Sequence, residues 1–236
     1  MLKKSLLTLA FAFFLGSCGG GGDGGGSSAT TQTLSVPLLT AVANLVNNGI
    51  TVKFSISGSS GNTTVTGSGT LTDAPAVAAT LNGVAVLKTT ETVTGTVVAN
   101  GNSAPLSASR IFYRNPSTFA VVVDDQGNPY IVFGNYNYPA SVKAGDAAML
   151  ATGTMFSNST QATKTGTVTL SYAVAADGAN SLLVTFIDSD FDNSNNKTAE
   201  GKTTFRVDTS GNISFVSLTI TGFAVNGQTP FTLVFQ

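Results

Sequence analysis

The chain has 236 residues and little charge: 11 basic and 12 acidic side chains give a net charge of −1, and charged residues make up 10% of the whole. Without an excess of basic residues it has no surface suited to a phosphate backbone, which argues against a nucleic-acid partner. It has no histidine and one cysteine. A histidine-activated nucleophile and a cysteine–histidine zinc site are therefore excluded, so catalysis would need carboxylates, lysine, tyrosine or a recruited cation.

The first residues have the three parts of an export signal. Lys3 and Lys4 precede an apolar run over residues 6–15, and the sequence Leu-Gly-Ser-Cys follows at residues 15–18. A charged start, a short apolar run and small residues at a cleavage site are typical of a secretory signal peptide. The run is too short for a transmembrane helix, which needs roughly 20 apolar residues. We therefore expect residues 1–17 to be removed.

The sequence Leu-Gly-Ser-Cys resembles the lipobox of bacterial lipoproteins. In that family the cysteine receives a diacylglycerol, the signal is cut just before it, and the new amino terminus is acylated. The resemblance implies that Cys18 is the lipidated residue, and two or more chains hold a protein stably on a membrane. Gly19 rather than aspartate follows it, which implies transfer to the outer membrane. The face of that membrane stays open, and the alternative is an ordinary secretory signal with a chance cysteine.

Residues 18–35 have the composition of a flexible tether. They begin with Cys18 followed by seven glycines and one aspartate, and continue with serine, threonine and alanine. Residues 36–236 form the β-rich body, as one unit or as two packed β halves. The order of lipobox, glycine tether and β-rich body resembles uncharacterised envelope lipoproteins of Gram-negative bacteria, a likeness that implies no particular activity.

One short helix is predicted after the tether, over residues 36–48. Its apolar side chains recur at steps of three and four, the spacing of one helical face. They are Leu38, Leu39, Val42, Leu45 and Val46. Asn47-Asn48-Gly49 is a good stop signal, because glycine readily takes the positive φ that ends many helices.

From residue 50 onward the apolar period changes from 3.6 to 2. Residues 50–57 alternate strictly, and the same alternation recurs in segments separated by turn sequences as far as the last residues. Gly67 and Gly69 within the second segment suggest a bulge or a close approach by another backbone. The apolar phase slips by one residue near Val216, which predicts a β-bulge there.

About twelve short strands joined by hairpin turns predict an all-β, antiparallel meander, folded as a β-sandwich or as a water-soluble barrel. The outward positions are mostly threonine, serine and lysine, whereas a membrane-spanning barrel needs an apolar outer face. Residues 50–98 and 165–221 have a similar rhythm, which leaves two related halves open.

The sharpest candidate site is an acidic cluster at Asp188, Asp190 and Asp192. We expect these residues in a loop after a strand that ends at Ile187, where alternate carboxylates supply oxygens to a weakly bound calcium ion. The fit to the helix-flanked calcium loop is incomplete, because its closing glutamate is displaced by one residue to Glu200. The alternative is a solvated polar loop.

Two further patterns have a functional and a structural interpretation. Asp124 and Asp125 form an acid pair of the kind glycosidases use, or simply begin a hairpin turn. Several aromatic residues lie close in sequence and either line a ligand groove or pack on the sheet. They are Phe112, Tyr113, Tyr130, Phe133, Tyr136 and Tyr138.

The function that these observations favour is that of an outer-membrane-anchored lipoprotein with a binding, structural or envelope-maintenance role. We assign it no catalytic residue and no cofactor beyond the weak calcium site. Its expected partner is the membrane, reached through the lipid anchor, with a protein or glycan partner unspecified. The alternatives are a carboxylate-based hydrolase or sugar-active enzyme, and a lipid carrier with an apolar lumen.

Overall fold

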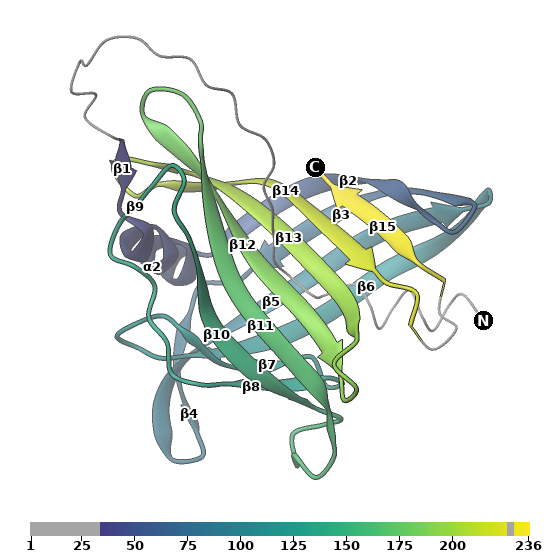
Figure 1. Cartoon of the computed structure of the whole chain (residues 1–236), viewed down its shortest axis with the longest axis horizontal. Coiled ribbons are helices and arrows are strands. Elements are labelled where there is room, and N and C mark those ends of the chain that lie inside the picture. The colour runs from purple at the N-terminus through teal and green to yellow at the C-terminus, as the bar shows by residue number, and fades with distance from the viewer. Residues whose placement is uncertain (1–33, 226–228) are drawn as a thin grey trace.

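The computed structural model describes residues 34–225 and 229–236, which form an antiparallel β-barrel with one helix at its end (Figure 1). Twelve strands make the closed barrel. They are β2 (Ile50–Ser60), β3 (Thr63–Asp73), β5 (Val84–Ala99), β6 (Asn102–Arg114), β7 (Val121–Asp125), β8 (Tyr130–Phe133), β10 (Ala147–Phe156), β11 (Lys164–Ala176), β12 (Ser181–Asp192), β13 (Lys197–Asp208), β14 (Ile213–Gly222) and β15 (Phe231–Phe235).

The barrel follows the chain almost without interruption. Each strand pairs with the next one along the sequence, except that β3 pairs with β5 and β8 with β10, and β15 closes the sheet by pairing with β2. In Figure 1 the green strands β10 to β13 cross in front of the blue and teal strands β3, β5 and β6. The all-β antiparallel prediction is confirmed, in its barrel form, and both meanders at 50–98 and 165–221 belong to the same closed sheet.

Strand β4 (Val77–Leu81) and the start of β5 form a hairpin that projects from the barrel (Figure 1). Asn82 and Gly83 make its two-residue turn with φ of 51° and 80°, values that suit asparagine and glycine. Val77 and Val84 on this hairpin are 59% and 64% exposed.

The predicted helix is present as α2 (Leu38–Asn48). Leu38, Ala41, Val42 and Val46 are buried, as the spacing of its apolar residues indicates. The helix ends at Gly49, which has a φ of 67° and donates its N–H to the carbonyl of Leu45 over 2.8 Å.

Just before the helix, β1 (Ser35–Val36) pairs with β9 (Val142–Lys143) outside the barrel. The folded body therefore includes Ser35, the last residue assigned to the tether. Cys18 and the signal segment lie outside the described residues.

Apolar residues form two large cores and a smaller one of Ala120, Tyr136, Ala151 and Leu170. The first joins α2 to the inner faces of β11, β12 and β13, and includes Val174, Val184 and Phe205. The second lies among β2, β3, β5, β6, β14 and β15, and includes Phe54 and Phe235, whose rings meet edge to face. No helix in the described part of the chain is both long and apolar enough to cross a membrane.

Two local predictions on the strands have clear outcomes. The register of β3 is continuous on both sides, so its glycines mark a close approach and not a bulge. A Cβ on Gly69 would lie 2.3 Å from the carbonyl oxygen of Thr94. The bulge near Val216 is confirmed, because Thr204 pairs with Ser217 and Phe205 with Phe215, which leaves Val216 as the extra residue.

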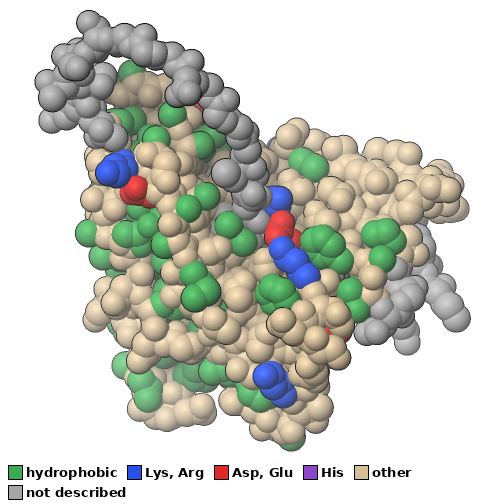
Figure 2. Space-filling view, viewed as in Figure 1, with side chains coloured by type: hydrophobic (Ala, Val, Ile, Leu, Met, Phe, Trp, Pro, Cys, Tyr) green, Lys and Arg blue, Asp and Glu red, His purple; other side chains and the backbone are tan. Residues whose placement is uncertain are grey.

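Side chains with a charge are sparse on the face of the molecule shown in Figure 2, where apolar groups are scattered among uncharged polar ones. Along β12 and its neighbours the outward positions are often threonine or serine, such as Thr185, which contacts Thr204 across the strand pair at 3.2 Å. The charged side chains of greatest interest lie instead inside the barrel.

Candidate functional site

A row of charged residues crosses the inner wall of the barrel from β3 to β7. Asp73 lies directly opposite Glu91, and Glu91 lies directly opposite Arg110. Asp124 follows on β7, opposite Phe112. Because side chains in a strand alternate between faces, each of these residues occupies a position that the strand period gives to the interior.

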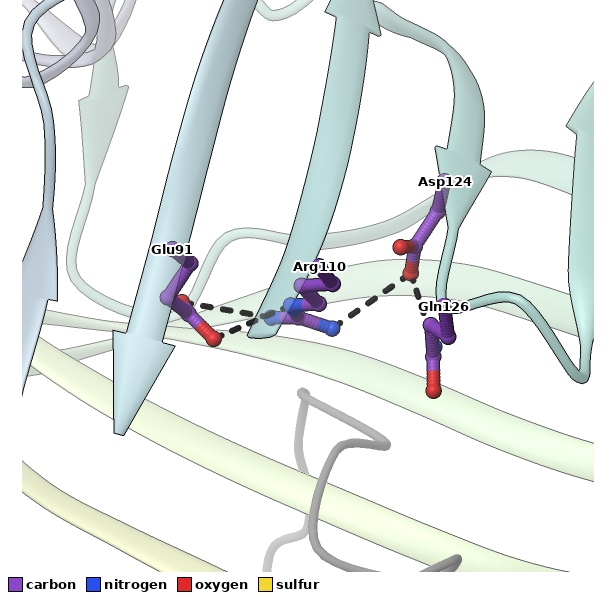
Figure 3. Close-up of polar contacts among 4 residues, drawn as sticks. All are labelled: Glu91, Arg110, Asp124 and Gln126. Carbon is purple, nitrogen blue, oxygen red and sulfur yellow. Dashed lines mark hydrogen bonds and ion pairs between the residues drawn. The ribbon is translucent and has the colours of Figure 1, made fainter. Parts of the chain in front are cut away.

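Arg110 on β6 links the two neighbouring strands, β5 and β7, through its side chain (Figure 3). Its Nε donates to Oε1 of Glu91 over 3.0 Å, and its Nη1 donates to Oδ2 of Asp124 over 3.4 Å. Gln126 donates its Nε2 to the same Asp124 oxygen over 3.0 Å. Glu91, Arg110 and Asp124 are between 3% and 6% exposed. Such a buried network is stable only while each charge keeps its partner.

The facing wall contributes Asp188 and Asp190 from β12. Both face the interior of the barrel. They follow the inward-facing Val184 and Phe186 on β12 at steps of two residues, and alternate residues of a strand share one face. Burial is the main cause that raises the pKa of both aspartates, and the charge of Asp124 on the opposite wall adds to it. Thr203 of β13, opposite Phe186, lies beside them.

A cavity of about 90 Å³ separates these walls. Its charged lining consists of Asp73, Glu91, Arg110, Arg114, Asp124 and Asp188. Its aromatic lining consists of Phe112, Phe133, Tyr138, Phe186, Phe205 and Phe215. Val42, Leu45 and Val46 of α2 close one side. The cavity is therefore bounded by acid groups, aromatic rings and the apolar face of the helix.

The interior carboxyl groups all bind protons more tightly than carboxyl groups in water. Desolvation raises the pKa of Glu91 to about 7 in spite of the neighbouring Arg110, and it raises the pKa of Asp190 to about 7 as well. Desolvation and the nearby Asp190 raise the pKa of Asp188 further. Desolvation also raises the pKa of Asp73 and Asp124, although arginines oppose it.

Arginine is the exception among these buried groups. Desolvation lowers the pKa of Arg110, but the charges of Glu91 and Asp124 outweigh it, so the net shift is upward. Arg110 and Arg114 supply two positive charges, whereas Asp73, Glu91, Asp124, Asp188 and Asp190 offer five acid groups. The interior therefore has more acid than base, and protons or a cation must balance the rest.

Several buried polar atoms in this part of the barrel have no hydrogen-bond partner. They are one carboxylate oxygen each of Asp73, Asp124, Asp188 and Asp190, the hydroxyl of Thr203 and Nε of Arg114. A buried polar group left without a partner costs about 1–3 kcal/mol. Such atoms are expected where a bound molecule or water completes the site.

The predicted calcium loop is wrong in its geometry. Strand β12 does not end at Ile187 but continues to Asp192, so Asp188 and Asp190 are strand residues that face the lumen. Asp192 lies at the hairpin, where its Oδ1 accepts from the N–H groups of Ser194 and Asn196 over 2.9 and 2.8 Å. The described residues include no group of three or more acid, histidine or cysteine side chains placed to hold a metal ion.

Glu200, which the predicted calcium loop needed as its closing ligand, contacts lysines and not the three aspartates. It pairs with Lys197 and with Lys202, the latter over 3.2 Å. The physical reason is that the inward alternation of β12 continues through the aspartates, and a register shift after Asp190 then turns the chain into the hairpin. The polar sequence at residues 188–192 was predicted as a loop because its composition is polar. Its place in a strand depends on pairing with β11 and β13, which local sequence does not show.

The acid pair and the aromatic group, the other two candidate patterns, each place only some of their residues in the lumen. Asp124 faces the lumen, whereas the Oδ1 of Asp125 accepts from the N–H of Gly127 in the turn over 2.9 Å. The two are therefore not an acid pair. Of the six aromatic residues, Phe112, Phe133 and Tyr138 line the cavity.

Tyr136 supports this aromatic wall from behind. Its ring meets those of Phe133 and Tyr138 edge to face, with centroids 6.5 and 5.5 Å apart, and its hydroxyl accepts from the N–H of Val121 over 2.9 Å. Tyr113 and Tyr130 are not among the residues that line the cavity. Half of the set therefore lines the cavity, and a ligand there stays a prediction.

Sequence reasoning missed Asp73, Glu91, Arg110 and Arg114. A signal for two of them was present: Glu91 is in phase with the apolar Val93 on β5, and Arg110 with Phe112 on β6. A charge in phase with the apolar positions of a strand indicates a buried ion pair or a site.

No protein-family model matches the chain, and the comparisons with curated proteins and with solved structures found no significant match. The functional argument therefore depends on the geometry of the lumen and on the amino-terminal sequence.

Proposed function

We propose that the protein is an outer-membrane-anchored lipoprotein with a binding role, whose barrel encloses a small polar ligand. The observation that carries the binding role is the cavity of about 90 Å³ with buried, unpartnered carboxylate oxygens on its wall. The anchor is supported by the lipobox-like sequence at residues 15–18. We favour no catalytic role for the chain.

The small size and the charged side chains of the cavity weigh against a lipid carrier. Pockets for drug-sized ligands begin at about 300 Å³, whereas this cavity has about 90 Å³. Charged side chains such as Glu91 and Asp188 line the same space, where an acyl chain would leave them without partners.

The small size of the cavity also weighs against a hydrolase that acts on sugars. A glycosidase places two carboxyl groups on either side of a sugar ring in an accessible cleft. Here Asp188 and Asp190 lie on one strand, and the cavity they adjoin is too small for a sugar polymer. The acid groups are better suited to holding a ligand than to cleaving one.

A size-graded binding screen tests this proposal on the full-length lipidated protein in detergent. Compounds of roughly three to twenty heavy atoms, with positive, neutral and negative members at each size, are incubated overnight so that slow entry is not mistaken for failure to bind. We expect a rise in Tm for small polar compounds and none for fatty acids. Stabilisation by fatty acids alone, or by no compound of any size, would overturn the proposal.

A further inference from the structure

The ligand class follows from three properties of the lumen: its charge, its unpartnered atoms and its aromatic wall. This inference depends on the binding role proposed above and specifies what is bound. The charge comes first. Five acid groups face two arginines, and α2 contributes only apolar residues to the cavity. A cation would favour the ionised form of these acids and replace the protons that they hold, whereas an anion would oppose their ionisation.

The unpartnered atoms show where that cation would contact the wall. Asp73 is 7% exposed and Thr203 is 1% exposed, yet Oδ1 of the first and the hydroxyl of the second have no partner, and both residues line the cavity. Asp188 of β12 also lines the cavity, and its Oδ1 has no hydrogen-bond partner either. These oxygens belong to three strands, β3, β12 and β13, so they would be reached together by a ligand with several donors pointing in different directions.

The aromatic wall already holds cations elsewhere in the same lumen. The guanidinium carbons of Arg110 and Arg114 lie 4.3 and 4.8 Å from the centroid of the Phe112 ring. Contacts at this distance between a cation and a ring face are attractive, and more so away from water. Phe133 and Tyr138 line the cavity too, so a third cation would meet rings of the same kind.

We infer that the cavity binds a small organic cation with several N–H donors, of the amidinium, guanidinium or alkylammonium class. A bare metal ion is less suited, because the described acid groups do not gather three or more ligands around one point. The volume sets an upper limit: about 90 Å³ is smaller than the cavity of about 150 Å³ that admits benzene in another protein. The ligand, or the part of it that enters, therefore has only a few heavy atoms.

Three probes of nearly the same shape test the charge directly: acetamidinium, acetamide and acetate carry charges of +1, 0 and −1. Each is titrated into the full-length lipidated protein in detergent at neutral pH, with overnight incubation, and binding is followed by calorimetry and by ligand-observed NMR. We expect acetamidinium to bind at least tenfold more tightly than acetamide, and acetate not to bind.

Matched variants locate the site. Asp188→Asn and Asp124→Asn should each weaken acetamidinium binding by tenfold or more, whereas Asp125→Asn, at the end of β7 with its side chain bonded to the turn, should not change it. Thr203→Val is the second variant if either asparagine variant fails to fold, and it should weaken binding several-fold.

The outcomes separate this inference from the binding proposal. Equal binding of acetamide and acetamidinium would overturn the cation inference and leave a neutral-ligand binding protein. Binding that Asp125→Asn weakens as much as Asp124→Asn would place the cation on the surface and overturn the luminal site. If no probe binds while the size-graded screen finds a ligand, only the inference fails; if both fail, the binding role fails with it.

Discussion

Asp190 shows how one buried side chain can set the pH dependence of the whole barrel. Desolvation raises its pKa to about 7, and the same cause raises the pKa of Glu91 to about 7. In the unfolded chain such groups titrate near pH 4. Between these values the folded protein holds protons that the unfolded chain has lost, so the free energy of unfolding falls as pH rises.

We therefore predict that the protein becomes less stable from pH 5 to pH 7, by about 1.4 kcal/mol per pH unit for each extra proton held. The variant Asp190→Asn cannot ionise, so it should match wild type only below about pH 4, exceed it increasingly from pH 5 to pH 7 and show a shallower slope. Urea unfolding at five pH values measures this. The charged groups on the facing elements are Asp73, Glu91, Arg110, Arg114, Asp124 and Asp188.

Asp192→Asn is the matched control, two residues away at the hairpin. Hydrogen bonds from Asn196 and Ser194 lower the pKa of Asp192, so its contribution to stability is lost only as pH falls below the usual aspartate range. Between pH 5 and 7 this variant should keep the slope of wild type. A wild-type stability that rises from pH 5 to 7 would show that the interior acids are ionised and balanced.

At the scale of single residues, the sequence predicted few of the residues that line the cavity. Asp188 and Asp190 were selected correctly as unusual, but for a loop they do not occupy. Arg110 and Glu91 lie 19 positions apart, and their contact depends on the register of β5 against β6. Local composition does not record that register. The sequence can therefore indicate that each residue is unusual, but it cannot predict that the two are in contact.

Among the elements, β3 and β5 pack closely at a pair of glycines. Gly69 and Gly95 lie directly opposite each other. A Cβ on Gly95 would lie 2.2 Å from the carbonyl oxygen of Ser68 and 2.7 Å from the Cα of Gly69. Distances this short mean that a side chain can enter only if one strand backbone moves.

We predict that Gly95→Ala destabilises the fold by about 1–3 kcal/mol, the usual effect of overpacking. Gly134→Ala is the matched control, because nothing lies within 4 Å of a Cβ at that position, and it should change stability by less than about 0.5 kcal/mol. Chemical denaturation of both variants measures the difference. Equal stabilities would mean that the two strands separate more easily than their packing indicates.

Elements were predicted far better than sites. The helix α2, its end at Gly49 and the bulge at Val216 all follow from apolar period and phase, which are properties of neighbouring residues. The choice between sandwich and barrel depends on whether β15 pairs with β2, and no local pattern records that pairing. Closure is a property of the whole chain.

At the scale of the whole molecule, the position of the barrel in the cell remains a proposal that one residue tests. We predict that Cys18→Ser abolishes labelling by palmitate and moves the protein from the outer-membrane fraction to the precursor or soluble periplasmic pool. Membrane fractionation with and without labelled palmitate measures both effects. A serine variant that stays with membranes, beside a wild type that takes up no label, would contradict the lipid anchor.

The pairing of β15 with β2 also determines when the barrel can be completed. Ser55 and Gln236 are 181 positions apart and exchange two backbone hydrogen bonds of 2.8 and 3.1 Å. During synthesis, every earlier strand can find its neighbour as it emerges, but β2 must wait for β15. Until then β2 and β14 are open edges that can pair with another chain. A newly made molecule is therefore most vulnerable to aggregation just before β15 is made, and a chaperone that covered one edge would protect it during that interval.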